Sequence, residues 1–158
     1  MFTKIFCRTF QAVMKVASYF LGYRMPEYIS GPGSIRRLPE FMLDKGAKKT
    51  LVVTDKTLTK LGLLDGMLES FKENNIDYVL FDGVSPNPTS DDVEAGYKLY
   101  AEHGCQCLVA FGGGSPMDAA KAIALMAANP NEDESVFYTP KALPHLPVVC
   151  IPTTCGTG

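Results

Sequence analysis

Residues 109–124, VAFGGGSPMDAAKAIA, join the end of an apolar run to three consecutive glycines and then to the beginning of a helix. The apolar run shows no polar alternation, which is typical of a parallel strand covered on both faces. Glycines after such a strand let backbone N–H groups approach an anion without a Cβ in the way, and the helix N-terminus adds favourable partial charge. The stretch therefore predicts a strand, a phosphate-binding loop and a helix.

The residues after the glycines also fit a plain helix start. Ser115 suits the N-cap, Pro116 the first helical position and Asp118 the third, which makes a capping box. On this alternative the two polar side chains only begin a helix, and Lys121 is only solvated. A cap does not need three preceding glycines, so both interpretations stay open. The G-x-G-x-x-G pattern fails because its third glycine would fall at Met117, and the P-loop pattern has no match.

The rest of the chain repeats the alternation of strand and helix signals. Apolar strand runs are expected at residues 50–54, 78–81, 107–111 and 148–151. Helical patterns lie between them. One ends at Asn74, one begins after Thr89, which can cap it together with Asp92 three residues on, and one spans residues 117–128. Such alternation predicts the α/β class, with a Rossmann-like, mostly parallel sheet and helices on both of its faces.

Two further loops follow predicted strands and should gather at the same edge of the sheet. Asp55 ends the first strand, where a carboxylate can accept hydrogen bonds from a ribose diol and would repel a 2′-phosphate, which favours NAD over NADP. The alternative is that Asp55 caps a helix beginning near Thr57. Residues 152–158, PTTCGTG, supply three hydroxyls and two glycines suited to lining a nicotinamide and a pyrophosphate, or they form a plain polar turn.

Three motifs together resemble those of the iron-containing (group III) alcohol dehydrogenases: residues 84–89, VSPNPT, residues 112–121, GGGSPMDAAK, and residues 152–158, PTTCGTG. The resemblance covers the chain from about Tyr28 onward and implies NAD as cofactor and a small alcohol or aldehyde as substrate. The cofactor-binding residues that it implies are Asp55 at the adenosine ribose, Asn87 near the cofactor, Gly113, Gly114 and Ser115 at the pyrophosphate together with Gly112 in the same loop, Asp118 near the nicotinamide, and Thr153, Thr154 and Thr157 along the cofactor.

The resemblance also implies a part that this sequence does not contain. The family continues the PTTCGTG motif with Ser-Glu and an all-helical C-terminal domain, and it takes its Fe²⁺ or Zn²⁺ ligands, one Asp and three His, from that later part. No residue here is therefore assigned as catalytic or as a metal ligand, and His103 and His145 do not match ligand positions. We expect the N-terminal part of an NAD-dependent, metal-dependent alcohol dehydrogenase, cut inside the PTTCGTG loop. The alternative is an inactive truncated fragment that is at most a nucleotide-binding module.

Residues 1–25 stand apart from the dinucleotide-binding domain expected at residues 26–158. Apolar residues recur there at helical spacing opposite Lys4, Arg8 and Lys15, which predicts an amphipathic helix too short and too charged to span a bilayer. This helix packs on its own domain or on a subunit neighbour, or else it is an interfacial membrane helix or a targeting sequence. A membrane is not the expected partner.

The composition narrows the partners and the compartment. A net charge of −2 argues against a nucleic-acid binder, which would need a basic face. Five cysteines are an odd number without the spacing of a disulfide framework, and the pair Cys105 and Cys107 is far weaker than a zinc knuckle. We expect a cytoplasmic protein and leave open a homo-oligomer.

Overall fold

The computed structural model describes residues 8–16, 26–131 and 143–154, and the chain divides into two compact units, Met1–Ser34 and Ile35–Gly158. In the first unit, residues 8–16 form a helix on which Phe10, Val13, Met14 and Val16 are exposed. This helix lies inside the segment where the spacing predicts one. The rest of that segment, residues 1–7 and 17–25, lies outside the described residues.

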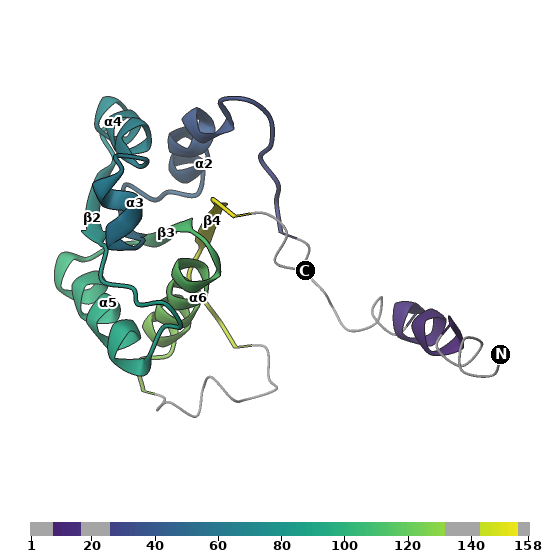
Figure 1. Ribbon diagram of the computed structural model, residues 1–158. Coiled ribbons are helices and arrows are strands. Elements are labelled where there is room, and N and C mark those ends of the chain that lie inside the picture. Colours follow the sequence, from purple (N-terminus) through teal and green to yellow (C-terminus); the bar gives the residue numbers. More distant parts are fainter. Residues whose placement is uncertain (1–7, 17–25, 132–142, 155–158) are drawn as a thin grey trace. The chain divides into compact units, whose positions relative to one another are not determined.

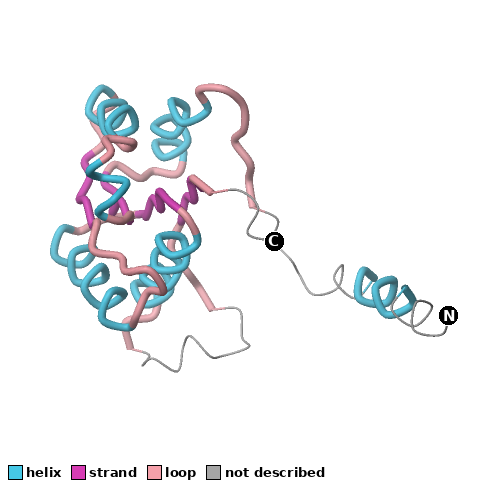
Figure 2. Tube along the Cα trace, viewed as in Figure 1, coloured by secondary structure: helices cyan, strands magenta, loops and turns pink. Residues whose placement is uncertain are grey.

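The second unit is built around a four-stranded sheet in the order β2-β1-β3-β4, in which every pair is parallel (Figures 1 and 2). The strands are β1 Lys49–Val53, β2 Asp77–Phe81, β3 Cys107–Gly112 and β4 Val148–Pro152. Each of them coincides within two residues with an expected apolar run, so the prediction of a parallel sheet is confirmed.

Helices cover both faces of the sheet. Their bounds are η1 Ser34–Arg37, a 3₁₀ turn, α2 Leu38–Asp44, α3 Lys56–Lys60, α4 Asp65–Glu73, α5 Ser90–His103 and α6 Gly114–Ala128. Helices α2 and α4 lie over one face, and α5 and α6 lie over the other (Figure 1). The expected Rossmann-like arrangement is confirmed.

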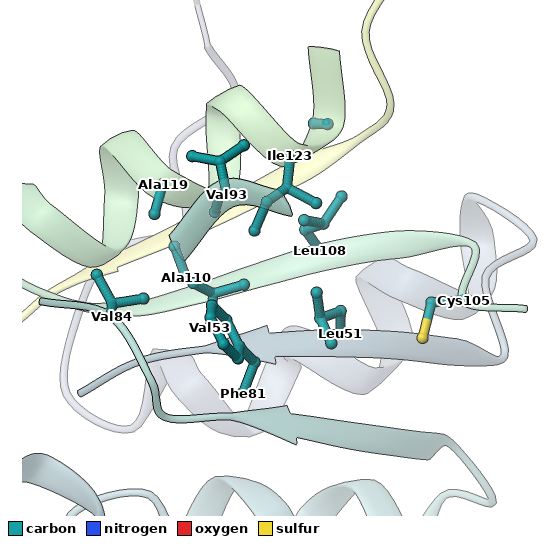
Figure 3. Packing of buried hydrophobic residues seen from close by; sticks show 12 residues of the cluster. Leu51, Val53, Phe81, Val84, Val93, Cys105, Leu108, Ala110, Ala119 and Ile123 are labelled. Carbon is teal, nitrogen blue, oxygen red and sulfur yellow. The ribbon is translucent and has the colours of Figure 1, made fainter. Parts of the chain in front are cut away.

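Two apolar clusters hold these layers together, because successive side chains of a strand point to opposite faces. Leu51 and Val53 of β1 pack with Ile123 of α6 in the cluster drawn in Figure 3. Val52 packs on the other side of the sheet with Phe71 of α4. All six residues of β3 are buried, as a central parallel strand requires.

The expected helix ends are also present. Thr89 caps α5 by accepting a hydrogen bond from the Asp92 N–H, and the Asp92 carboxylate accepts one from the Thr89 N–H, which completes the capping box. Gly104 ends the same helix in the left-handed region, with φ of 62°. Asn74 follows the last residue of α4, as the sequence predicts.

Candidate functional site

The candidate site lies where the strand order reverses, between β1 and β3. From β1 the chain goes to β2 on one side, whereas β3 and β4 lie on the other side. Ligands of open α/β sheets bind in the crevice beyond the carboxyl ends of the strands at such a point. The loop after β1 begins with Thr54 and Asp55, and the loop after β3 begins with Gly113. The fold therefore brings these two predicted loops to one edge of the sheet.

Of the three glycines in the loop, Gly112 is the one that the backbone conformation and the neighbouring atoms require to be glycine. Gly112 has φ of +149°, and a Cβ there would lie 2.7 Å from Pro116 Cγ and 3.1 Å from Leu58 Cδ1. A Cβ on Gly114 would meet no atom within 4 Å. Gly112 is thus required by the fold itself, while the space beside Gly114 is open to a ligand.

Helix α6 begins earlier than the sequence predicts. Gly113 is the N-cap and no side chain caps the helix, so Ser115 is its second residue and Asp118 its fifth. The capping-box interpretation of these two residues is wrong, because the extended backbone of Gly113 turns the chain into the helix ahead of Ser115. Pro116 is tolerated in the first turn, where its missing N–H costs nothing. The N–H groups of Gly114 and Ser115 have no intrahelical acceptor and are suited to an anion.

Asp118 and Lys121 form an ion pair on the surface of α6. Their Oδ1 and Nζ atoms lie 3.5 Å apart, and the two side chains are 70% and 61% exposed. An exposed pair of this kind contributes little to stability. Lys121 is therefore not merely solvated, and Asp118 stands at the surface one turn beyond the glycine loop.

Asp55 does cap a helix, as the sequence left open. Its Oδ1 accepts hydrogen bonds from the N–H groups of Thr57 at 2.8 Å and Leu58 at 3.1 Å, at the start of α3. Both capping bonds go to Oδ1, so Oδ2 lies outside the cap. The side chain is half-buried and directly follows the end of β1 and Thr54. Helix capping and a role toward a ribose are therefore compatible at this residue.

The Pro-Asn-Pro loop holds Asn87 in a left-handed conformation, with φ of +59°. Asn tolerates the left-handed region better than most residues, but this conformation is uncommon for any residue other than glycine. The Asp92 carboxylate fixes the loop from both sides, since it accepts hydrogen bonds from the N–H groups of Thr89 at 3.1 Å and Ser85 at 3.4 Å. The exposed Asn87 side chain is thereby presented on a defined turn.

The loop after β4 contacts the glycine loop. The Thr153 N–H donates to the Gly112 carbonyl at 3.0 Å. The Thr154 side chain lies beside Gly113, with its Oγ1 3.4 Å from where a Cβ of that glycine would stand. The expected Thr157 lies outside the described residues. Thr153 and Thr154 are thus brought to the glycine loop as expected.

Thr54 was missed as part of the site by sequence reasoning, which used it only as the end of a strand. It is fully buried, its N–H donates to the Phe81 carbonyl at 2.9 Å, and its Oγ1 donates to the Phe111 carbonyl at 2.9 Å. One residue thereby joins the ends of β2, β1 and β3. The available signal was a hydroxyl at the end of an otherwise apolar strand, directly before an acid.

Among the described residues, the free thiols of Cys105, Cys107 and Cys150 lie in or next to strands β3 and β4. Burial raises the pKa of Cys107 and of Cys105, and these two residues pack in different clusters on opposite faces of the sheet. Burial likewise raises the pKa of Cys150 in β4, with Lys121 opposing the rise and Asp118 adding to it. Cys105 and Cys107 therefore do not converge on a shared metal ion.

The described residues do not fit a metal centre. Within residues 8–16, 26–131 and 143–154, no group of three or more His, Cys, Asp or Glu side chains is placed to hold a metal ion.

A family model described as iron-containing alcohol dehydrogenase matches residues 26–158. The chain belongs to the iron-containing alcohol dehydrogenase family. The family match starts after the described N-terminal helix and includes the whole sheet with the glycine loop. It confirms the resemblance on which the expected site residues depend.

Several curated members of the family are similar to this chain. Choline dehydrogenase of Bacillus subtilis (strain 168) is 41% identical over 152 residues, which cover 92% of this chain and 38% of that protein. NAD-dependent methanol dehydrogenase of Bacillus methanolicus is 37% identical, with 84% of this chain and 35% of that protein covered. Lactaldehyde reductase of Escherichia coli (strain K12) is 35% identical, with 81% and 34% covered. The chain thus spans about a third of the length of these relatives.

Solved structures of the family have the same fold. A 1,3-propanediol oxidoreductase has a TM-score of 0.72 and 34% identity, covering 85% of this chain and 37% of that one. A sulfoacetaldehyde reductase from Bifidobacterium kashiwanohense, solved in complex with NAD⁺, has a TM-score of 0.69 and 28% identity, covering 85% and 38%. Within the part of this family member that the structure describes, no helix combines the length and apolar character needed to cross a membrane.

Proposed function

We propose that this chain is the NAD-binding part of an alcohol dehydrogenase that transfers a hydride between a small alcohol or aldehyde and NAD. In the oxidative direction the alcohol would give a hydride to NAD⁺ and its hydroxyl proton to solvent. The observation that carries the proposal is the glycine loop at the reversal of the strand order, where Gly112 is required by the backbone and Gly114 faces open space.

Each expected site residue has a role in this proposal. The backbone from Gly112 to Ser115 would bind the pyrophosphate, because the first N–H groups of α6 have no acceptor within the helix. Asn87 would bind near the cofactor from its fixed turn, and Asp118 would lie near the nicotinamide. Thr153, Thr154 and Thr157 would line the cofactor with hydroxyl groups.

Asp55 would make the site selective for NAD. Its Oδ2 would accept hydrogen bonds from the adenosine ribose, and its charge would repel the 2′-phosphate of NADP. The half-buried position at the end of β1 supports this role, and so does the use of Oδ1 alone for the helix cap.

We propose that the described residues bind the cofactor and do not hold the metal ion. An iron or zinc ion would polarise the oxygen of the alcohol or aldehyde in the complete enzyme. We expect this chain alone to bind NADH without turning over a substrate, because the family resemblance assigns the metal ligands, one Asp and three His, to residues other than those of the cofactor site. A chain that acts only as a nucleotide-binding module is the alternative, and it too would bind NADH.

The test is a binding titration followed by an activity assay on the 158-residue chain. NADH fluorescence anisotropy should rise on binding, and ADP-ribose should compete while NADPH should bind more weakly. Oxidation of NADH with short aldehydes and added Fe²⁺ or Zn²⁺ should then be absent. A chain that leaves NADH unbound contradicts the proposal, and turnover by the chain alone contradicts the assignment of the metal to other residues.

The division at residue 25 is part of the same proposal. The buried members of both apolar clusters lie between Leu38 and Ala124, and we expect these clusters to stabilise the domain without residues 1–25. Deleting residues 1–25 should leave the urea unfolding midpoint and the NADH affinity unchanged. A lower midpoint would mean that the N-terminal helix packs on the domain. Co-sedimentation with anionic vesicles that is lost on deletion would instead assign the helix to a membrane surface.

A reducing compartment such as the cytoplasm is expected from the free thiols of Cys105, Cys107 and Cys150.

A further inference from the structure

We infer that Thr54 is a positioning residue for the glycine loop: its hydroxyl sets the separation of the carboxyl ends of β1 and β3 and thereby the conformation that binds the dinucleotide. The inference rests on the proposed function for its ligand. It concerns a residue that none of the three family motifs contains and that would not touch the cofactor itself.

The first step is where the backbone pairing stops. Strands β1 and β3 are paired in register up to Val53 and Ala110, where the backbone pairing between them ends. Beyond that pair, the Thr54 Oγ1 donates to the Phe111 carbonyl at 2.9 Å. A side chain therefore links the two strands beyond their last backbone pair, at their carboxyl ends.

The second step is how tightly Thr54 itself is held. Its N–H donates to the Phe81 carbonyl of β2 at 2.9 Å, and the residue is fully buried, so water cannot replace either bond. Its β-branched side chain has few rotamers to choose from. Thr54 is thus a fixed donor, and the Phe111 carbonyl is fixed with it.

The third step is that Phe111 directly precedes the glycine loop. The next residue is Gly112, whose carbonyl accepts a hydrogen bond from the Thr153 N–H. Its φ of +149° is a backbone conformation that residues with a Cβ rarely adopt. A shift of the Phe111 peptide would displace Gly112 and change the direction of the N–H groups that follow. The Thr54 hydroxyl therefore acts on the loop through one peptide group.

The same strand supplies a matched control. Thr50 is also fully buried, and its Oγ1 donates to the Cys107 carbonyl of β3 at 3.2 Å. Thr50 and Thr54 thus make the same kind of bond between the same two strands, but Thr50 lies at the amino end, away from the loop. Any loss that is only structural should be shared by Thr50→Val and Thr54→Val.

The experiment compares Thr54→Val, Thr54→Ser and Thr50→Val in the 158-residue chain. Valine keeps the shape and removes the hydroxyl, which leaves a buried carbonyl without its donor. We expect Thr54→Val to weaken NADH binding about tenfold and Thr54→Ser to stay within about twofold of the parent. Thr50→Val should lower the urea midpoint as Thr54→Val does but leave NADH affinity within about twofold. Equal NADH affinities for the two valine variants would overturn the inference.

A second measurement needs no ligand and separates this inference from the proposed function. Hydrogen exchange of the Gly113 and Gly114 amides should become faster in Thr54→Val than in Thr50→Val at matched stability. Equal exchange in the two variants would overturn the positioning role even if NADH binds. Faster exchange in Thr54→Val would support that role even if the parent chain proved not to bind NADH, an outcome that contradicts only the proposed function.

Discussion

Gly112 and Pro116 approach each other so closely at the start of α6 that a Cβ on Gly112 would lie 2.7 Å from Pro116 Cγ. The backbone of Gly112 also has a φ of +149°, a conformation that residues with a Cβ rarely adopt. Two independent constraints therefore require glycine at the end of β3. The tight turn from strand to helix depends on this residue before any ligand binds.

Gly112→Ala should consequently destabilise the domain. Both the strained backbone and the contact with Pro116 oppose alanine, and we expect the free energy of unfolding to fall by about 2 kcal/mol or more. Urea unfolding of the parent and the variant measures this directly. A variant as stable as the parent would contradict the geometry assigned to the turn.

Gly114→Ala should instead leave stability nearly unchanged and weaken NADH binding. No atom lies within 4 Å of the added Cβ, and Gly114 is the first residue of α6, where alanine is well tolerated. Stability should stay within about 0.5 kcal/mol of the parent. NADH affinity should fall by about tenfold, because the methyl group occupies the open space proposed for the pyrophosphate. Unchanged NADH affinity, measured by fluorescence anisotropy, would place the pyrophosphate elsewhere.

Asp55→Asn separates the two roles of Asp55. Asparagine caps helices as well as aspartate does, so α3 should be retained and stability should change by less than about 0.5 kcal/mol. Loss of the charge should narrow the preference for NADH over NADPH, because the 2′-phosphate is no longer repelled. Parallel titrations with the two nucleotides measure the ratio of their dissociation constants. An unchanged ratio would leave Asp55 with the cap as its function.

The free energy of unfolding should fall as the pH rises above the usual thiol pKa of about 8.5. Burial raises the pKa of Cys107 in the folded chain, against an opposing hydrogen bond from Thr50, and burial also raises the pKa of Cys105. The folded chain then holds these protons more tightly than the unfolded chain. Their stabilising contribution is complete below the unfolded pKa and is lost as the pH rises through the folded pKa.

Urea unfolding from about pH 7 to about pH 10 measures this slope. Cys107→Ala should lower stability at every pH because a buried side chain is shortened, but it should flatten the decline at alkaline pH. A decline of the same steepness in the variant would show that other groups cause it. Tyr100 is the next group to consider, since burial raises its pKa as well.

The sheet was predictable because its strands carry the signal locally. The apolar run at residues 107–111 has no polar alternation, and β3 is buried throughout, as a central strand must be. The capping box at Thr89 and Asp92 is equally local, since both partners lie within one turn.

The start of α6 was not predictable in the same way. The sequence of Ser115, Pro116 and Asp118 fits a cap as well as it fits the interior of a first turn. What decides between the two is the extended backbone of Gly113, which needs no side chain to begin the helix. The role of Thr54 depends on which strand lies beside β1, and this follows from the topology and not from neighbouring residues.

The most direct test of the proposed cofactor site is a map of backbone amide chemical shifts during a titration of the 158-residue chain with NADH. We expect the largest changes at Asp55, Gly113, Gly114 and Ser115. A groove of about 570 Å³ between η1 and α4, lined in part by Ile35 and Met67, serves as the internal comparison and should not respond. Shifts confined to that groove, or no shifts at saturating NADH, would contradict the assignment of the glycine loop to the dinucleotide.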